Sequence, residues 1–102
     1  MKYTQADVDA LNATLGLTGR KTFIHPLILE GEWVYCRGRR IEPYRIIGAV
    51  LDAWSKAGQD FEVAHRWFMG ESQWRVVSQY GPSSGNWHSD IPTAVIKANT
   101  AW

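Results

Sequence analysis

Apolar residues recur at helical spacing near the start of the chain. Val8, Leu11 and Leu15 lie three or four positions apart, and Thr4 precedes them as a residue that commonly caps a helix. This spacing places apolar side chains along one face of a helix. The pattern predicts a short amphipathic N-terminal helix over residues 5–15.

The longest helical pattern begins near Pro43, a residue suited to the first turn of a helix, and ends before Gly58. Its apolar positions follow the spacing of a helix that packs on a core. The expected core face consists of Tyr44, Ile47, Val50, Leu51 and Trp54. We expect this helix to be the main one on which the other elements of the domain pack.

Two shorter apolar patterns follow, separated by a tight turn at Met69 and Gly70. The residues expected to face inward are Val63, Ala64, Trp67 and Phe68 in the first segment and Trp74 and Val77 in the second. A support helix followed by two short helices is the arrangement of a helix-turn-helix. The pattern therefore predicts a helix-turn-helix core over residues 43–80.

The remaining segments predict a hairpin and a last helix. Apolar and β-branched residues over 22–36 are interrupted by a polar turn at Gly31, which is typical of a β-hairpin. Asp90 precedes an apolar helical pattern and predicts a C-terminal helix over 90–101. We therefore expect one domain over residues 1–102, mainly α with a small β-hairpin, built on a three-helix, winged-helix-like core.

The composition is that of a folded protein without an export or membrane signal. Of the 102 residues, 45% are hydrophobic and 21% are charged, proportions that exclude a disordered chain. No apolar run reaches the length of a membrane helix, and Cys36, the single cysteine, has no disulfide partner in the chain. We expect a cytoplasmic protein with no membrane segment.

The residues with reactive or metal-binding side chains do not form a recognisable catalytic motif. His25, His65 and His88 are scattered over three predicted elements, and the sequence contains no phosphate-binding glycine loop and no nucleophile motif. A nucleophilic Cys36 would require a neighbouring base that the sequence does not show. We expect no metal, no cofactor and no catalytic activity.

The second short helix of the predicted helix-turn-helix presents polar side chains suited to reading DNA. The expected base-reading residues are Ser72, Gln73, Arg75, Ser78 and Gln79. Gln contacts adenine and Arg contacts guanine through paired hydrogen bonds. A helix in this position would lie in the major groove of double-stranded DNA.

Positive charge is concentrated around a turn at Gly38. From Arg20 to Arg45 six basic residues face three acidic ones, whereas from Ile46 onward four basic residues face five acidic ones. DNA binding requires Lys and Arg that neutralise phosphates, and the predicted helix-turn-helix lies in the half of the chain that lacks net positive charge. The basic turn would therefore have to supply the phosphate contacts. The expected phosphate-contacting residues are Arg37, Arg39, Arg40 and Arg45. The alternative is a solvated basic loop.

Six tryptophans are many for a chain of this length. Three of them fall on predicted core faces: Trp54, Trp67 and Trp74. The other three, Trp33, Trp87 and Trp102, either close over the small core or form an exposed apolar patch. Because tryptophan is enriched at the energetic centres of protein interfaces, these three are the candidate protein-interface residues.

One stretch carries the order of features of a known family. The shared residues are His25, Pro26, Ile28, Leu29, Gly31 and Val34, then Gly38, Arg39, Arg40 and Ile41, followed by predicted helices. Over residues 25–80 the chain resembles the family of bacterial domains of unknown function numbered 433, the VapB-like antitoxins. Arg39 stands where that family has threonine. The resemblance implies a winged-helix-like domain that pairs with a toxin or regulates transcription by binding DNA, usually as a dimer.

Two functions follow from these observations. The first is a small DNA-binding regulator of antitoxin type, which reads DNA with its helix-turn-helix and forms a homodimer. The alternative is a protein-binding module or inhibitor that acts through exposed tryptophans and does not bind DNA. A single face carrying Arg37, Arg39, Arg40 and Arg75 would favour DNA, and an exposed tryptophan surface would favour a protein partner.

Overall fold

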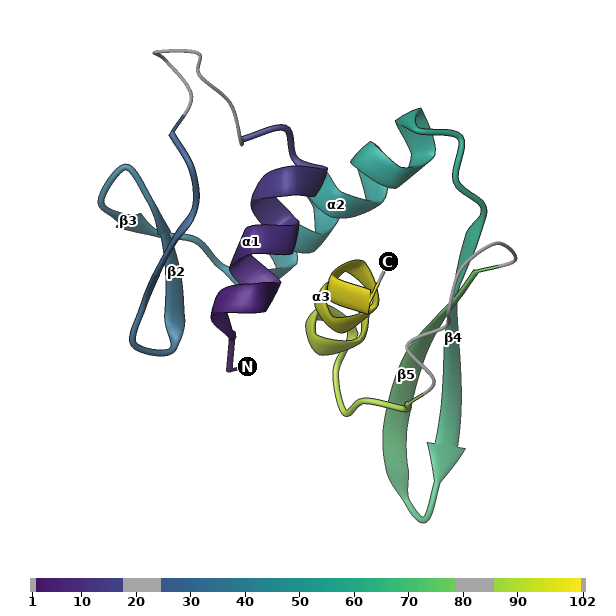
Figure 1. The fold of residues 1–102 in the computed structure, drawn as a ribbon. Coiled ribbons are helices and arrows are strands. Elements are labelled where there is room, and N and C mark those ends of the chain that lie inside the picture. The colour runs from purple at the N-terminus through teal and green to yellow at the C-terminus, as the bar shows by residue number, and fades with distance from the viewer. Residues whose placement is uncertain (1, 18–24, 79–85, 102) are drawn as a thin grey trace.

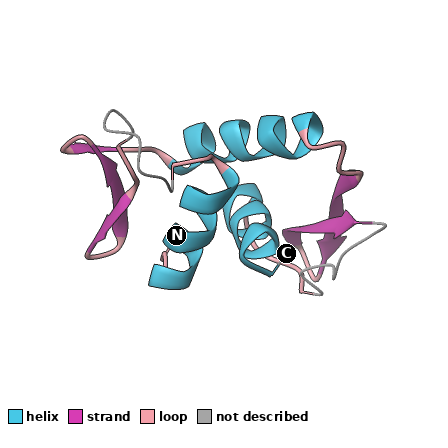
Figure 2. Cartoon of the chain, turned by 45° about the horizontal axis from the view of Figure 1, so that its top comes forward, coloured by secondary structure: helices cyan, strands magenta, loops and turns pink. Residues whose placement is uncertain are grey.

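Three helices lie between two separate antiparallel sheets (Figure 1, Figure 2). The computed structural model describes residues 2–17, 25–78 and 86–101. The elements in chain order are α1 (Gln5–Thr14), β1 (Ile28–Glu30), β2 (Trp33–Cys36), β3 (Arg39–Arg40), α2 (Pro43–Lys56), β4 (Phe61–Phe68), β5 (Glu71–Ser78) and α3 (Ile91–Ala101). The sheet β1–β2–β3 lies on one side of the helices and the hairpin β4–β5 on the other (Figure 2).

The first two helices form where the apolar spacing predicts them. The Thr4 hydroxyl accepts a hydrogen bond from the Asp7 amide at 3.1 Å, while the Thr4 amide donates to the Asp7 carboxylate at 2.9 Å, so α1 begins with a capping box. Pro43 opens α2, and Gly58, with φ of 73°, follows its end. The expected core face of α2 is wrong at one position, because Tyr44 is 64% exposed.

The last helix, α3, is the centre of the core. Asp90 caps it by accepting a hydrogen bond from the Thr93 amide at 2.8 Å. Its buried residues surround most of its circumference: Pro92, Ala94, Val95, Ile96, Ala98 and Asn99. A helix that is buried nearly all round lies inside a domain rather than on its surface. It contacts α1, α2 and β5, and so joins both halves of the molecule.

The predicted hairpin over 22–36 is observed as β1 and β2 and is extended by a third strand. Ile28 pairs with Tyr35 and Glu30 with Trp33, which leaves Gly31 and Glu32 as a two-residue turn. Arg40 of β3 pairs with Tyr35 on the other edge of β2. Residues 18–24, which include the start of the predicted hairpin, lie outside the described part of the chain.

The helix-turn-helix expected between residues 60 and 80 is wrong. Phe61–Phe68 and Glu71–Ser78 are strands β4 and β5, paired without a break from Phe61 with Ser78 to Phe68 with Glu71. The fold is therefore α+β, with neither a helix-turn-helix nor a winged-helix-like core in its described residues, and it is not mainly α.

These residues form strands because the segment from Phe61 to Phe68 also has apolar residues at alternate positions, the spacing of a strand. Phe61, Val63, His65 and Trp67 occupy alternate positions and share one face of the strand, together with Val76 and Trp74 of its partner. Alternation with β-branched and aromatic residues favours a half-buried strand. Phe61 makes an edge contact with Trp54, their ring centres 5.2 Å apart, and Val76 is fully buried.

Buried polar side chains tie the helices together. Asp7 of α1 accepts hydrogen bonds from Lys97 and Thr100 of α3, each at 2.6 Å. Asn99 of α3 accepts from Trp54 of α2 at 3.1 Å and from Thr14 of α1 at 2.7 Å. Because buried polar groups are costly unless they are hydrogen-bonded, these contacts favour one arrangement of the three helices.

The Asp7 carboxylate also makes stability depend on pH. Burial by itself would raise the pKa of Asp7, but the hydrogen bonds from Lys97, Thr100 and the Thr4 amide hold this pKa below its usual value. A lowered pKa in the folded state stabilises the fold fully at pH values above the unfolded pKa of about 3.9. This contribution is lost as the pH falls through the folded pKa.

We predict that Asp7→Asn lowers the free energy of unfolding at pH 7 by about 1–3 kcal/mol, because Lys97 loses its charged partner. Urea denaturation followed by circular dichroism measures this loss, which should shrink below about pH 4 as the wild-type carboxylate becomes protonated. The control is Asp9→Asn on the exposed side of α1, which should stay within about 0.5 kcal/mol of wild type. Equal stability of the two variants at pH 7 would contradict the role of Asp7.

Candidate functional site

The hairpin β4–β5 forms an arm that projects from the helices (Figure 1). Eight paired residues in each strand give it a length of about 27 Å at roughly 3.4 Å per residue. Near its base, β5 packs against α3 and buries Val76. Towards its tip the two strands extend beyond the helices (Figure 1).

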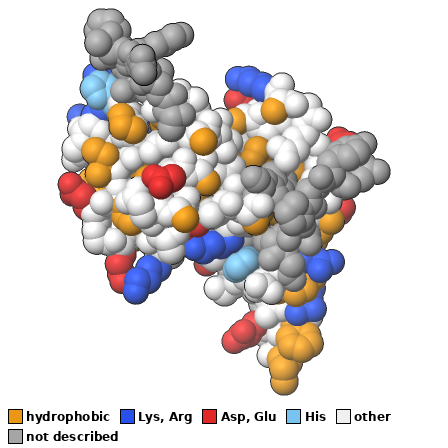
Figure 3. Space-filling model, viewed as in Figure 1, with side chains coloured by type: hydrophobic (Ala, Val, Ile, Leu, Met, Phe, Trp, Pro, Cys, Tyr) orange, Lys and Arg blue, Asp and Glu red, His pale blue; other side chains and the backbone are white. Residues whose placement is uncertain are grey.

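Three consecutive apolar residues are exposed at the tip of this arm. Trp67 is 72% exposed, Phe68 48% and Met69 88%. Figure 3 shows the hydrophobic side chains gathered at the far end of the arm, with basic side chains next to them on the side of the core. We call Trp67, Phe68 and Met69 the arm tip. Large apolar side chains in an exposed group are a common feature of interaction sites.

The turn at the arm tip places Met69 in an unfavourable backbone conformation. Met69 and Gly70 have φ of 52° and 79° and form the two-residue connection between β4 and β5. Such turns, with positive φ at both residues, favour Asn followed by Gly. A residue with a large side chain and no local hydrogen bond in this conformation costs about 1 kcal/mol. Neither backbone preference nor packing within the described residues therefore explains why a methionine occupies position 69.

One face of the arm is held by a stack of charged and aromatic side chains. The guanidinium carbons of Arg66 and Arg75 lie 4.3 and 4.5 Å from the ring centre of Trp87. Arg66 also lies 4.6 Å from the ring of Phe68 and donates from Nε to the Gln73 side chain at 2.8 Å. Cation–π contacts of this kind contribute about 0.5–2 kcal/mol each. They stiffen the arm behind its tip.

Trp87 reaches this face because the chain returns along β5. The amide and carbonyl of Trp74 are both hydrogen-bonded to His88, each at 2.7 Å, which adds a short bridge on the free side of β5. Burial lowers the pKa of His88, although Asp90 acts in the opposite direction. A neutral imidazole is thus favoured beside β5, and the bridge places Trp87 next to Arg75.

The opposite face of the arm supports Trp67. The His65 ring lies 4.4 Å from the Trp74 ring and makes an edge contact with Trp67, with ring centres 5.6 Å apart. His65 Nε2 is also 2.6 Å from the Ser72 hydroxyl. Because Trp74 packs against the core, these contacts connect the exposed tryptophan to the body of the molecule.

The predicted base-reading residues are divided between the two faces of β5. Ser72 and Ser78 share the face of Trp74, whereas Gln73 and Arg75 lie on the face of the stack. The Ser78 hydroxyl donates to the Asp60 carbonyl at 3.2 Å, and Gln79 lies outside the described residues. The structure therefore brings Gln73 and Arg75 together and separates them from the two serines. Their reading of DNA bases stays a prediction.

The predicted phosphate-contacting arginines are all exposed, and three of them meet at one groove. Arg37, Arg39 and Arg45 line a groove of about 600 Å³ beside the three-stranded sheet. Arg40 points elsewhere, pairing with Glu42 at 2.9 Å and lying 4.4 Å from the ring centre of Trp33. The three-stranded sheet and the arm lie on opposite sides of the helices (Figure 2), and none of the residues that line the groove belongs to the arm.

Two of the three predicted interface tryptophans lie in the described part of the chain, and both are half-buried. Trp33 is half-buried beneath Arg40, Trp87 is half-buried between Arg66 and Arg75, and Trp102 lies outside the described residues. Among the described residues, the most exposed tryptophan is Trp67, which the helical pattern placed in the core. The signal that could have identified it is the alternate spacing of Phe61, Val63, His65 and Trp67, which puts a large residue near the end of the hairpin.

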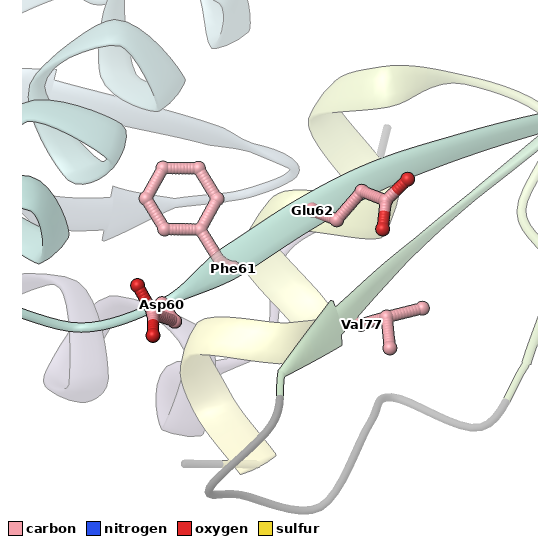
Figure 4. A pocket seen from close by; sticks show the side chains of 4 residues that line it. All are labelled: Asp60, Phe61, Glu62 and Val77. Atoms are coloured by element: carbon pink, nitrogen blue, oxygen red, sulfur yellow. The ribbon is translucent and has the colours of Figure 1, made fainter.

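A second hollow, of about 460 Å³, lies at the base of the arm (Figure 4). Asp60, Phe61, Glu62 and Val77 line it. Phe61 stands between the two acidic residues, which point in different directions, so their carboxylates do not converge on one ligand (Figure 4). Across residues 2–17, 25–78 and 86–101, no three His, Cys, Asp or Glu side chains are grouped closely enough to hold a metal ion.

None of the helices in the described part of the chain has the length and apolar character of a membrane span. Comparison with models of protein families, with curated proteins and with solved structures finds no match to this chain. The resemblance to the VapB-like antitoxins is therefore neither supported nor opposed by these comparisons and stays a prediction.

We predict that Met69→Asn raises the free energy of unfolding by about 0.5–1 kcal/mol, because Asn tolerates the positive φ that Met69 adopts. Thermal and urea denaturation of the purified protein measure the change. Met69→Ala is the matched control, since it removes the apolar side chain but keeps the backbone cost, and it should leave stability close to wild type. A loss of stability in Met69→Asn would show that the Met69 side chain is needed for the fold.

Proposed function

We propose that the chain is a protein-binding module that inserts its arm tip into an apolar pocket of a partner protein. The carrying observation is the exposure of Trp67, Phe68 and Met69 together at the end of a projecting two-stranded arm. Burying large apolar side chains contributes about 1.5–3 kcal/mol each. Three of them at a protruding end supply the kind of central contact that dominates protein interfaces.

The conformation of Met69 supports a binding role for the tip. A turn selected only for folding would favour Asn or Gly before Gly70, yet the chain has an exposed methionine with a positive φ. Backbone strain of this kind is concentrated at functional sites. The flexible, polarisable methionine side chain also adapts readily to the surface of a partner.

The charge of the arm favours a protein over a nucleic acid. From Phe61 to Ser78 the two glutamates balance the two arginines, so the arm has no net charge with histidine neutral. Both guanidinium groups also lie against Trp87 rather than open to a phosphate backbone. Nucleic-acid affinity depends largely on Lys and Arg that neutralise phosphates, and the arm offers little of this.

The arm is ordered before it binds. The Trp87 stack fixes one face, the contacts of His65 fix the other, and all eight residues of β4 pair with β5. A preorganised surface loses less conformational entropy on association than a flexible loop. The module therefore acts as an inhibitor or adaptor does, by presenting a stiff insertion element. A toxin is the partner that the antitoxin resemblance would imply.

We expect the double variant Trp67→Ala, Met69→Asn to fold as stably as wild type and to lose partner binding. Proteins from a cell extract that are retained by immobilised wild type, but not by the double variant, are produced in pure form and titrated by calorimetry. The double variant should weaken direct binding by at least about 100-fold, as expected for the loss of two central side chains.

Two exposed apolar residues away from the arm supply the controls. Tyr44 is 64% exposed on α2 and Ile28 is 54% exposed on β1, so Tyr44→Ala and Ile28→Ala should bind the purified partner as wild type does. Equal binding by the double variant would overturn the proposal. A dimer of the wild type that the double variant abolishes would identify a second copy as the occupant instead, and tip-dependent binding to duplex DNA would favour the DNA-binding alternative.

A further inference from the structure

The groove beside the three-stranded sheet combines an apolar floor with a cationic rim. Its apolar lining comes from Leu15, Leu27, Cys36, Ile41, Ile46 and Ala49, and its charged lining from Arg37, Arg39 and Arg45. The end of α1, the first half of α2 and the strands β2 and β3 therefore converge on it. Its volume of about 600 Å³ lies within the range of small-molecule sites, roughly 300–1,000 Å³.

The charge at this groove is uncompensated. None of the nine lining residues carries a carboxylate, and within the described residues Arg37, Arg39 and Arg45 form no ion pair. Arg40 provides the contrast, because it is the next residue after Arg39 and is neutralised by Glu42. Successive strand residues point to opposite faces, which turns Arg39 to the groove and Arg40 to Trp33.

The backbone helps to hold one of these arginines in place. Arg37 has φ of 55° and precedes Gly38, with φ of 78°, in the turn between β2 and β3. Positive φ is unfavourable for an arginine, which offers no short polar side chain to compensate the backbone. The turn nevertheless keeps Arg37 at the rim, beside Arg39 of the following strand.

We propose that this groove binds a small organic anion that has an apolar body and one phosphate or carboxylate group. The guanidinium groups match the planar, paired hydrogen bonds of such an anion, and the apolar floor excludes water from its body. This inference goes beyond the protein-binding arm, because it concerns other residues on the other side of the helices.

The single cysteine gives a local measurement of binding. Cys36 is half-buried in the lining, and its thiol lies 3.7 Å from the His25 carbonyl. A ligand in the groove should shield this thiol from alkylation. Iodoacetamide, which is neutral, is the labelling reagent, and intact-protein mass spectrometry gives the rate of modification at Cys36, the single cysteine of the chain.

Octyl phosphate is the probe, and inorganic phosphate and octan-1-ol represent its two halves. We expect octyl phosphate to slow the alkylation of Cys36 at concentrations where neither half does. In the double variant Arg39→Gln, Arg45→Gln, half-protection should require at least about tenfold more octyl phosphate, since the loss of even one charged hydrogen bond weakens binding by about that factor. Octanoate, tested in parallel, distinguishes a carboxylate ligand from a phosphate ligand.

Arg40→Gln is the matched control, because it removes the same charge from the adjacent position without altering the groove lining. It should change the half-protecting concentration by less than about twofold, and Trp67→Ala with Met69→Asn should leave it unchanged, which separates this proposal from that of the arm. The proposal is overturned if octan-1-ol or inorganic phosphate protects Cys36 as well as octyl phosphate does. It is also overturned if the Arg39→Gln, Arg45→Gln variant, shown by circular dichroism to be folded, is protected as well as wild type is.

Discussion

The packing of α3 against α1 and α2 through the buried side chains of Asp7 and Asn99 is the constraint on which the rest of the molecule depends. Asp7 joins α1 to α3, and Asn99 joins α3 to both Thr14 and Trp54. An apolar helix interface tolerates sliding, whereas a buried carboxylate or amide oxygen finds its hydrogen-bond donors in few alignments. Since α3 also supports β5, this alignment sets where the arm stands relative to the groove.

Helical periodicity identified α1, α2 and α3, but it also predicted two helices between residues 60 and 80 that the structure shows as strands. Thr4, Pro43 and Asp90 begin α1, α2 and α3 in the structure as in the prediction. The arm was missed because its apolar residues fit both a helical and an alternating pattern over a short span. What decides between them is the pairing of β4 with β5 across Met69–Gly70, a non-local contact that single-sequence periodicity does not contain.

For the candidate sites, too, the sequence pattern did not show in which direction single side chains would point. The sequence indicated a cluster of arginines, and Arg37, Arg39 and Arg45 do meet at one groove. It did not indicate that Arg40 would turn to Trp33, because the two-residue strand β3 was not expected. Assigning Trp67 to a helical core face likewise hid the most exposed tryptophan of the described residues. In each case the direction of a side chain depended on strand alternation.

The pairing of the arm leaves β4 as an outer strand, since no other strand of the described residues pairs with its second edge. An outer strand is a template on which further chains can add, and charged side chains along it act as gatekeepers against aggregation. Glu62 and Arg66 occupy that position here. The exposed apolar side chains of Trp67, Phe68 and Met69 are instead gathered around the turn, where a second chain finds little backbone to pair with. The exposed apolar side chains at the turn are thus kept apart from the edge of β4 on which a second chain could pair, and spreading apolar character from the turn along β4 would remove that protection.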